Sequence, residues 1–326
     1  MSTYLATAVA APNIAFIKYW GNTDPKLKLP ANGSISMNLA ALETITSIHF
    51  MPHLKADRLI INSHPAESMA QERVSNFLDH VRRMAHHEIF AEIESQSNFP
   101  IGAGIASSAS AFAALALASS SALGLALNEQ ELSSLARLGS GSACRSIPSG
   151  FVEWKIGDRH ENSFAVSIAS ANHWDLVDCI AIVEKSHKSV GSTVGHALAD
   201  TSPLQTARIK NAEERLNICR MAILNRDFSA FSKVVELDSN MMHAVMMTST
   251  PPILYWAPAS VQIMKKIMEW RAEGLQVCYT LDAGPNVHAI CISRDAEEVK
   301  NRLSKISAVE NIIMSRPGKH AHLLQE

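Results

Sequence analysis

Pro100-Ile101-Gly102-Ala103-Gly104-Ile105-Ala106-Ser107-Ser108-Ala109-Ser110 is a loop rich in glycine and serine that runs directly into an alanine-rich segment. Small residues let a backbone approach an anion without obstruction by Cβ. The start of a helix adds unpaired N–H groups and the positive end of its dipole. The loop differs from G-x-x-x-x-G-K-[ST], because no lysine follows the second glycine. On this segment alone, phosphate binding and a tight turn capped by Ser107 are both open.

Length and composition are those of a folded protein with room for two lobes. The chain has 326 residues, of which 47% are hydrophobic and 18% charged, and this balance argues against disorder. A formal net charge of -2 gives no broad attraction for polyanions, so no nucleic-acid partner is predicted. The 5 cysteines are widely spaced without a C-x-x-C pair, which favours reduced thiols in a cytoplasmic protein.

Targeting, membrane and metal signals are weak. The first residues lack a basic region followed by an apolar stretch, so no signal peptide is predicted. The apolar stretch 106–127 is long enough to span a membrane, but it is rich in alanine and serine and has no basic or aromatic flanks. It predicts a buried helix and no membrane association. Neither His86-His87 nor the pair His320 and His322 offers a convincing ligand set, so no protein metal site is predicted.

The order of elements predicts an α+β fold. In the first half, strands are expected over 34–39, 46–50, 59–61, 92–95, 151–154 and 176–183, and helices over 70–85, 109–123 and from Asn128, with Glu131 at capping-box spacing. In the second half, helices are expected around 209–223, 260–273 and 296–306, and strands over 277–281, 288–292 and 311–314. A change to polar composition near residue 185 divides the chain into lobes 1–185 and 186–326.

Four polar segments interrupt these elements, at 12–22, 100–110, 137–146 and 281–286. Each alone is more often a turn than a site. Together they supply Lys18, Arg145, Asp282 and several serines, which is the set that phosphoryl transfer needs. Cations stabilise phosphate charge, N–H groups bind it, and a carboxylate orients or deprotonates an attacking hydroxyl.

The four segments together resemble the mevalonate diphosphate decarboxylase family, within the GHMP superfamily of galactokinase, homoserine kinase, mevalonate kinase and phosphomevalonate kinase. The resemblance rests on Asn13-Ile14-Ala15, Lys18-Tyr19-Trp20-Gly21, Ala103-Gly104-Ile105-Ala106-Ser107-Ser108-Ala109, Gly139 to Ser146, and Asp282 to Asn286. The motifs occur in the family's order and cover nearly the whole chain. They imply an N-terminal α/β lobe, a ferredoxin-like C-terminal lobe and an active site in the cleft between them.

The resemblance also implies a reaction in isoprenoid biosynthesis. ATP with Mg2+ phosphorylates the tertiary C3 hydroxyl of a phosphorylated mevalonate; the C3 phosphate then departs as the carboxylate leaves as carbon dioxide. Asp282 is implied as the catalytic carboxylate, Lys18 as the cation that keeps it ionised, and Arg145 as the group that grips the substrate carboxylate or a phosphate. A homodimer is also implied.

Further site residues follow from the same motifs. Those expected to bind the substrate are Asn13, Tyr19, Asn22, Ser140, Gly141, Ser142 and His196. Those expected to bind the nucleotide are Asn98, Gly102, Ala103, Gly104, Ala106, Ser107, Ser108 and Ser192. Cys144 resembles a buried small residue and not a nucleophile.

Two departures from the family pattern bear on the substrate. Asn22 stands where the family motif has a second lysine that holds the substrate's diphosphate, and the loss of such a contact is worth roughly 1.5–3 kcal/mol. His196 stands where methionine is common; it donates to a single phosphate or simply packs. These departures favour mevalonate 5-phosphate, giving isopentenyl phosphate, over the alternative mevalonate 5-diphosphate. A 3-kinase or 3,5-bisphosphate branch, a homoserine kinase and a non-catalytic nucleotide-binding protein are less favoured, because the full motif set is present.

Overall fold

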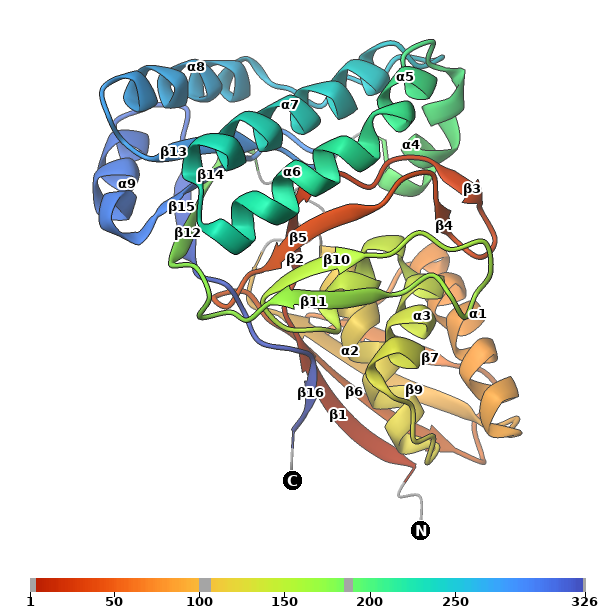
Figure 1. The fold of residues 1–326 in the computed structure, drawn as a ribbon. Coiled ribbons are helices and arrows are strands. Elements are labelled where there is room, and N and C mark those ends of the chain that lie inside the picture. The colour runs from red at the N-terminus through yellow and green to blue at the C-terminus, as the bar shows by residue number, and fades with distance from the viewer. Residues whose placement is uncertain (1–3, 100–106, 185–189, 325–326) are drawn as a thin grey trace.

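The computed structural model describes residues 4–99, 107–184 and 190–324, and they form an α+β protein built on three main sheets (Figure 1). The first sheet has the strand order β16-β1-β6-β9-β7-β8. Its strands are β1 (Leu5–Ala10), β6 (Thr44–Met51), β7 (Arg58–Ile61), β8 (His64–Pro65), β9 (Phe90–Ser97) and β16 (His322–Leu323). The helices of this lobe are α1 (Ser68–Ala85), α2 (Ser107–Ala122) and α3 (Glu129–Gly139).

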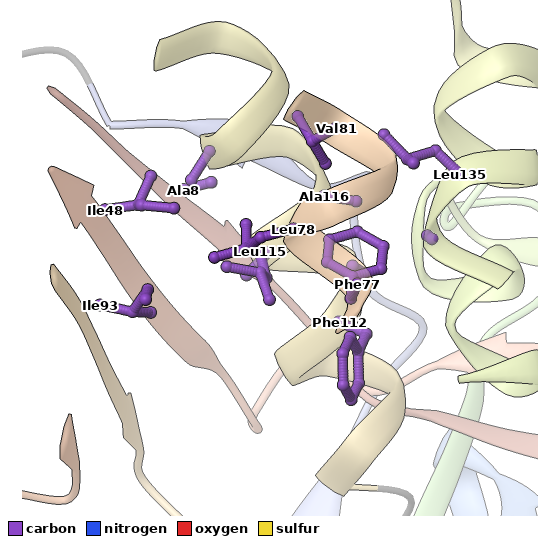
Figure 2. Packing of buried hydrophobic residues seen from close by; sticks show 14 of the residues in the cluster. Ala8, Ile48, Phe77, Leu78, Val81, Ile93, Phe112, Leu115, Ala116 and Leu135 are labelled. Atoms are coloured by element: carbon purple, nitrogen blue, oxygen red, sulfur yellow. The ribbon is translucent and has the colours of Figure 1, made fainter. Parts of the chain in front are cut away.

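The predicted buried helix is confirmed as α2, which forms the centre of the first core. It packs against β1, β6, α1 and α3, and its many alanines let these neighbours approach closely. Figure 2 shows side chains from three helices and the sheet meeting in this core, among them Phe77, Leu78, Phe112, Leu115 and Ile48. Most residues of α2 are buried by these neighbours, whereas Ser107 and Ser108 at its start are only half-buried.

Helix α3 begins at the predicted capping box. The Asn128 side chain accepts hydrogen bonds from the N–H groups of Gln130 and Glu131, and the Glu131 carboxylate accepts one from the Asn128 N–H. The helix ends at Gly139 and is followed by the 3-10 helix η1 (Gly141–Ser146). The serine-rich segment 140–146 follows directly from the end of α3 and packs beside α2.

The second sheet has the strand order β11-β10-β5-β2. Its strands are β2 (Asn13–Ile17), β5 (Ser34–Asn38), β10 (Phe151–Trp154) and β11 (Ala165–Ala169), and a separate hairpin is formed by β3 (Asn22–Asp24) and β4 (Leu29–Pro30). Every residue of β2 is buried. The segment 12–22 was expected to be polar and to interrupt the regular elements, so β2 was not predicted. Asn13 at its start and Lys18 just after its end are buried polar residues with tertiary partners.

The third sheet confirms the predicted ferredoxin-like C-terminal lobe. Its strands are β12 (Leu176–Ile182), β13 (Val277–Thr280), β14 (Val287–Ile292) and β15 (Asn311–Ser315), all paired antiparallel in the order β13-β14-β12-β15. Helices α6 (Ala212–Asn225) and α7 (Phe228–Met247) cover one face, and α8 (Pro258–Ala272) and α9 (Ala296–Ser304) cover the other. Shorter helices are α4 (Ser192–Leu198), η2 (Ala199–Thr201), α5 (Gln205–Lys210) and η3 (Ser293–Asp295).

Three features of the structure differ from the sequence-based expectations. The single helix expected around 209–223 is divided at Asn211 into α5 and α6. Helix α7 was not predicted, because buried polar residues interrupt its apolar pattern. The end of the chain returns to the first lobe, where β16 pairs with β1, so both described ends of the chain lie at the same end of the molecule (Figure 1). The division at residue 185 stays a prediction, and β12, which precedes that residue, lies in the third sheet.

Two further observations concern the cysteines and the possibility of a membrane-spanning helix. All five cysteines are buried and none forms a disulfide. Within residues 4–99, 107–184 and 190–324, no helix combines the length and the apolar character that a bilayer crossing requires.

Candidate active site

A cavity of ≈ 530 Å³ lies where the two lobes meet. Its walls come from the end of β2, the start of α2, η1, α4 and the turn after β13. Its described walls carry the cations Lys18, Lys28, Arg73 and Arg145, against the carboxylates Asp200 and Asp282. The cavity is therefore cationic, although the chain as a whole has a net charge of -2. Such a site suits a small, highly charged anion.

The predicted pair of Lys18 and Asp282 is present at this cavity. Lys18 Nζ lies 2.6 Å from Asp282 Oδ1; the lysine side chain is 1% exposed and the aspartate side chain 23%. Burial lowers the pKa of Lys18, and the charge of Asp282 partly offsets that effect. Burial, the largest single effect, opposes ionisation of Asp282, but the charge of Lys18, its hydrogen bond and the positive charges of His288 and Arg145 together outweigh burial, so the pKa of Asp282 lies below its usual value. A carboxylate is thus presented to the cavity, with a buried cation behind it.

Arg145 is held at the cavity by neutral partners. Its Nη1 donates to Ser34 Oγ at 2.7 Å, and its Nη2 and Nε donate to Asn13 Oδ1 at 3.1 and 3.3 Å. Asn13 is fixed in turn by donating to Ser146 Oγ at 2.8 Å. Within the described part of the chain, Arg145 has no ion-pair partner. A buried guanidinium that makes no direct ion pair, although the charge of Asp282 acts on it across the cavity, fits an anionic ligand. Asn13 itself lies behind Arg145 and positions it.

Serine hydroxyls connect the start of α2 with η1. Ser108 Oγ lies 3.1 Å from Ser140 Oγ, which lies 3.4 Å from Ser142 Oγ, and all three residues line the cavity with Ser107. Gly141 sits between the last two serines against the ring of Tyr19, where an added Cβ would come within 2.5 Å of the ring. The two segments predicted to bind nucleotide and substrate phosphates therefore share one row of hydroxyl donors.

Tyr19, Asn22 and His196 form one packed group. The Tyr19 hydroxyl donates to Asn22 Oδ1. The His196 ring packs between Tyr19 and Trp20, with centroid distances of 4.1 and 4.5 Å, and its Nδ1 accepts a hydrogen bond from the Gly21 N–H at 3.0 Å. His196 thus packs and also lines the cavity, and the two roles considered from the sequence are compatible.

Two cations of the cavity were missed by sequence reasoning. Lys28 Nζ donates to the carbonyls of Leu138 and Gly139, and Arg73 Nη2 donates to the Gly139 carbonyl at 2.8 Å. Both side chains therefore gather at the C-terminal end of α3, where the helix dipole is negative. Burial, together with the positive charges of Arg73 and Arg137, lowers the pKa of Lys28 to about 8. No motif marks either residue, because Lys28 lies in a hairpin loop and Arg73 on the polar side of α1.

The remaining predicted residues fall in different places. Ser192 lines the cavity at the first position of α4. Asn98 lies away from it: its Nδ2 donates to the Ala41 carbonyl and its Oδ1 accepts from the Glu43 N–H. Cys144 is buried, and burial raises the pKa of its thiol to about 12, as expected for a residue that only packs. Outside the described residues lie Gly102, Ala103, Gly104 and Ala106.

Comparison with known proteins identifies the family to which this chain is similar. Residues 10–165 match the diphosphomevalonate decarboxylase-like N-terminal domain, and residues 179–322 match the mevalonate 5-diphosphate decarboxylase C-terminal domain. The diphosphomevalonate decarboxylase of Saccharomyces cerevisiae is 39% identical over 309 residues, covering 88% of this chain and 77% of the yeast protein. That of Bos taurus is 37% identical over 308 residues, covering 86% and 75%.

Solved structures agree with these matches. The mevalonate diphosphate decarboxylase of Enterococcus faecalis superposes with a TM-score of 0.93 at 36% identity, covering 99% of both chains. That of Staphylococcus aureus gives a TM-score of 0.94 at 36% identity, covering 99% of this chain and 98% of the other. Matches that extend through both lobes and their shared cavity establish that this chain belongs to the diphosphomevalonate decarboxylase family, within the GHMP superfamily.

Proposed function

We propose that this chain catalyses the ATP-dependent decarboxylation of mevalonate 5-diphosphate to isopentenyl diphosphate, by way of phosphorylation of the C3 hydroxyl. The observation that carries the proposal is the contact between Lys18 and Asp282 on the wall of a cationic cavity. A carboxylate kept ionised by a buried lysine is suited to accept the proton of a hydroxyl group during its attack on a phosphoryl group.

Arg145 supports the second half of the reaction. A tertiary hydroxide is a poor leaving group, whereas a phosphate on C3 is a good one. When the C3–O bond breaks, the electron pair of the bond to the carboxylate carbon forms the new double bond and carbon dioxide leaves. The guanidinium of Arg145, fixed by Asn13 and Ser34, is suited to hold that carboxylate until it leaves.

The cavity also fits ATP and Mg2+. One neighbouring structure, with a TM-score of 0.94 at 37% identity and 99% coverage of both chains, is described as a complex with MVAPP, AMPPCP and magnesium. Here Ser107 and Ser108 stand at the first turn of α2, a suitable place for phosphates. Bound Mg2+ would neutralise phosphate charge, and Ser108 and Asp282 are oxygen-bearing side chains on the same cavity that could hold it.

The comparisons favour the diphosphate over the monophosphate that the sequence alone preferred. Every relative named above is a diphosphomevalonate or mevalonate diphosphate decarboxylase. The structure adds a physical reason why Asn22 need not exclude a diphosphate. Lys28 and Arg73 bring positive charge to the same cavity from distant parts of the chain. The monophosphate is a second candidate, because Asn22 replaces a family lysine.

Parallel assays with the two substrates test the proposal. The measurement is kcat/KM for carbon dioxide release from mevalonate 5-diphosphate and from mevalonate 5-phosphate, with ATP and Mg2+ present. We expect the diphosphate to be preferred in the wild type, and Asn22→Lys to increase that preference. A wild-type preference for the monophosphate would overturn the proposal in favour of the second candidate. ADP formation without carbon dioxide from either compound would indicate a 3-kinase.

The lowered pKa of Lys28 predicts a pH dependence of substrate capture. Lys28 loses its charge as the pH rises through about 8. The kcat/KM for the phosphorylated substrate, which reports the free enzyme, should therefore decline above this pH.

The stability contributed by Lys28 should change with pH in the opposite sense. Between about pH 8 and the ordinary lysine pKa of 10.5, the unfolded chain holds more protons than the native one, so this group makes the free energy of unfolding rise with pH over that range.

Two lysine variants check this assignment. Lys28→Met should lower kcat/KM at neutral pH and flatten the alkaline decline. Lys26→Met is the matched control, because Lys26 is an exposed lysine in the same hairpin loop, and it should keep the wild-type profile. A full alkaline decline in Lys28→Met would show that another group titrates.

Location and assembly stay predictions. We propose a cytoplasmic enzyme that acts on a small phosphorylated substrate, as the buried thiols favour. The homodimer implied by the family resemblance can be checked by measuring the mass of the protein in solution.

A further inference from the structure

A group of buried charges stands behind the catalytic pair. The buried clamp consists of Asp238 on α7, Arg208 on α5 and Arg215 on α6, with side chains 0%, 1% and 5% exposed. Asp238 Oδ1 accepts a hydrogen bond from Arg215 Nε at 2.7 Å, and Arg215 Nη2 donates to the Arg208 carbonyl at 2.7 Å. Three helices of the C-terminal lobe are thereby joined at one point.

The buried clamp binds both backbone polar groups of Lys18. Asp238 Oδ2 accepts the Lys18 N–H at 2.6 Å, and Arg208 Nη2 donates to the Lys18 carbonyl at 2.6 Å. Lys18 lies just beyond β2, which ends at Ile17, so these backbone groups are not part of the ladder with β5. Asn32 Nδ2, from the first lobe, also donates to the Lys18 carbonyl at 2.9 Å, whereas the described partner of the Lys18 N–H is Asp238 of the other lobe. The position of Lys18 therefore depends in large part on side chains from the other lobe.

Ser239, which follows Asp238 in α7, contacts the chain segment that carries Asp282, the other member of the catalytic pair. Ser239 Oγ accepts a hydrogen bond from the N–H of Leu281 at 3.1 Å, and Leu281 directly precedes Asp282. Two consecutive residues of one helix thus fix the two chain segments that carry Lys18 and Asp282. Figure 1 shows α7 running along the top of the molecule above β2, in keeping with its contacts to β2 and β13.

We infer that Asp238, held by Arg208 and Arg215, and Ser239 are positioning residues that set the distance between Lys18 Nζ and Asp282 Oδ1. The inference rests on the proposed function, because it assigns the pair a catalytic role. A charged clamp is suited to this purpose, since hydrogen bonds to ionised groups are shorter and stronger than neutral ones. Buried charge alone is weak evidence for stability, and the backbone contacts to Lys18 give this cluster a specific task.

Asp238→Asn tests the inference against a purely structural role. Misplacement of a catalytic group by about 1 Å costs on the order of a hundredfold in rate. We expect kcat to fall by roughly tenfold to a hundredfold, with the KM values for ATP and mevalonate 5-diphosphate little changed. Asp57→Asn is the matched control, because Asp57 is also buried, also accepts a backbone N–H at 2.9 Å and also pairs with an arginine, but lies in the first lobe. It should lower the melting temperature and leave kcat unchanged.

A second pair of variants covers the case in which Asp238→Asn does not fold. Ser239→Ala should lower kcat, and Ser239→Thr, which keeps the hydroxyl, should restore it. Crystal structures of the variants give a readout independent of turnover. The contact between Lys18 and Asp282 should be lost in Asp238→Asn or Ser239→Ala and kept in Asp57→Asn. An intact contact and an unchanged kcat would overturn the inference. An inactive wild type with that contact disturbed in the variants would instead refute the proposed function alone.

Discussion

Asp282→Asn is expected to reduce kcat by about 10²- to 10⁴-fold, the range that removal of a general base produces. An amide keeps the size of the carboxylate but cannot accept the proton of the C3 hydroxyl. It also leaves Lys18, which is buried and 2.6 Å away, without its closest counter-ion. Because burial already lowers the pKa of Lys18, its charged form should be less favoured in the variant.

The decisive readout for Asp282→Asn is single-turnover ADP formation, accompanied by calorimetric binding of ATP and mevalonate 5-diphosphate. We expect binding to persist while the phosphoryl-transfer step is nearly lost. Asp79→Asn is a suitable control, since it removes a carboxylate from an aspartate–arginine contact of 2.7 Å on α1, away from the cavity. Asp282→Asn with a kcat close to that of the wild type would show that Asp282 is not the catalytic carboxylate.

Arg145→Met should have the second-largest effect, a loss of about ten- to a hundredfold in kcat/KM. This corresponds to the roughly 1.5–3 kcal/mol of a hydrogen bond between charged groups. Arg145 is buried and its partners Asn13 and Ser34 are neutral, so its charge is available to the ligand. Arg145→Lys should recover only part of the loss, because an ammonium cannot contact Asn13, Ser34 and a carboxylate with one planar fork.

Steady-state kinetics of both Arg145 variants, with melting temperatures measured alongside, separate binding from folding. Arg82→Met provides the control, as Arg82 is a buried arginine that pairs with Asp57 in the first lobe. It should destabilise the protein without lowering kcat/KM at temperatures where it is folded. Equal kinetic losses in Arg82→Met and Arg145→Met would indicate a general effect of removing buried charge.

Local patterns predicted those parts of the fold that local interactions determine. The capping box of Asn128 and Glu131 is complete within four residues, and it was placed correctly. The sequence of α2 has no charged residue and no polar face, and it correctly predicted that the helix is buried. Helix α7 escaped detection because Asp238, Ser239 and His243 lie among its buried residues. Those polar side chains are tolerated through partners on other elements, which a periodicity argument does not contain.

The same distinction holds for the site. Lys18, Arg145 and Asp282 stand in recognisable motifs, and the structure brings all three to one cavity. Lys28 and Arg73 meet only because the hairpin of β3 and β4 and helix α1 both reach the end of α3. Asn22 accounts for one charge lost from the local motif, whereas Lys28 and Arg73 add two charges from elsewhere in the chain. The charge of the cavity is the sum over residues that are far apart in the chain, and only the tertiary structure shows that sum.

The most direct test of the proposed reaction is the stoichiometry of a single turnover. The purified protein would be mixed with ATP, Mg2+ and mevalonate 5-diphosphate labelled in the carboxyl carbon, and labelled carbon dioxide and ADP would be counted together. Phosphorylation followed by decarboxylation predicts one carbon dioxide for each ADP, and neither product in Asp282→Asn. ADP without carbon dioxide, or equal carbon dioxide release by the wild type and Asp282→Asn, would contradict this account.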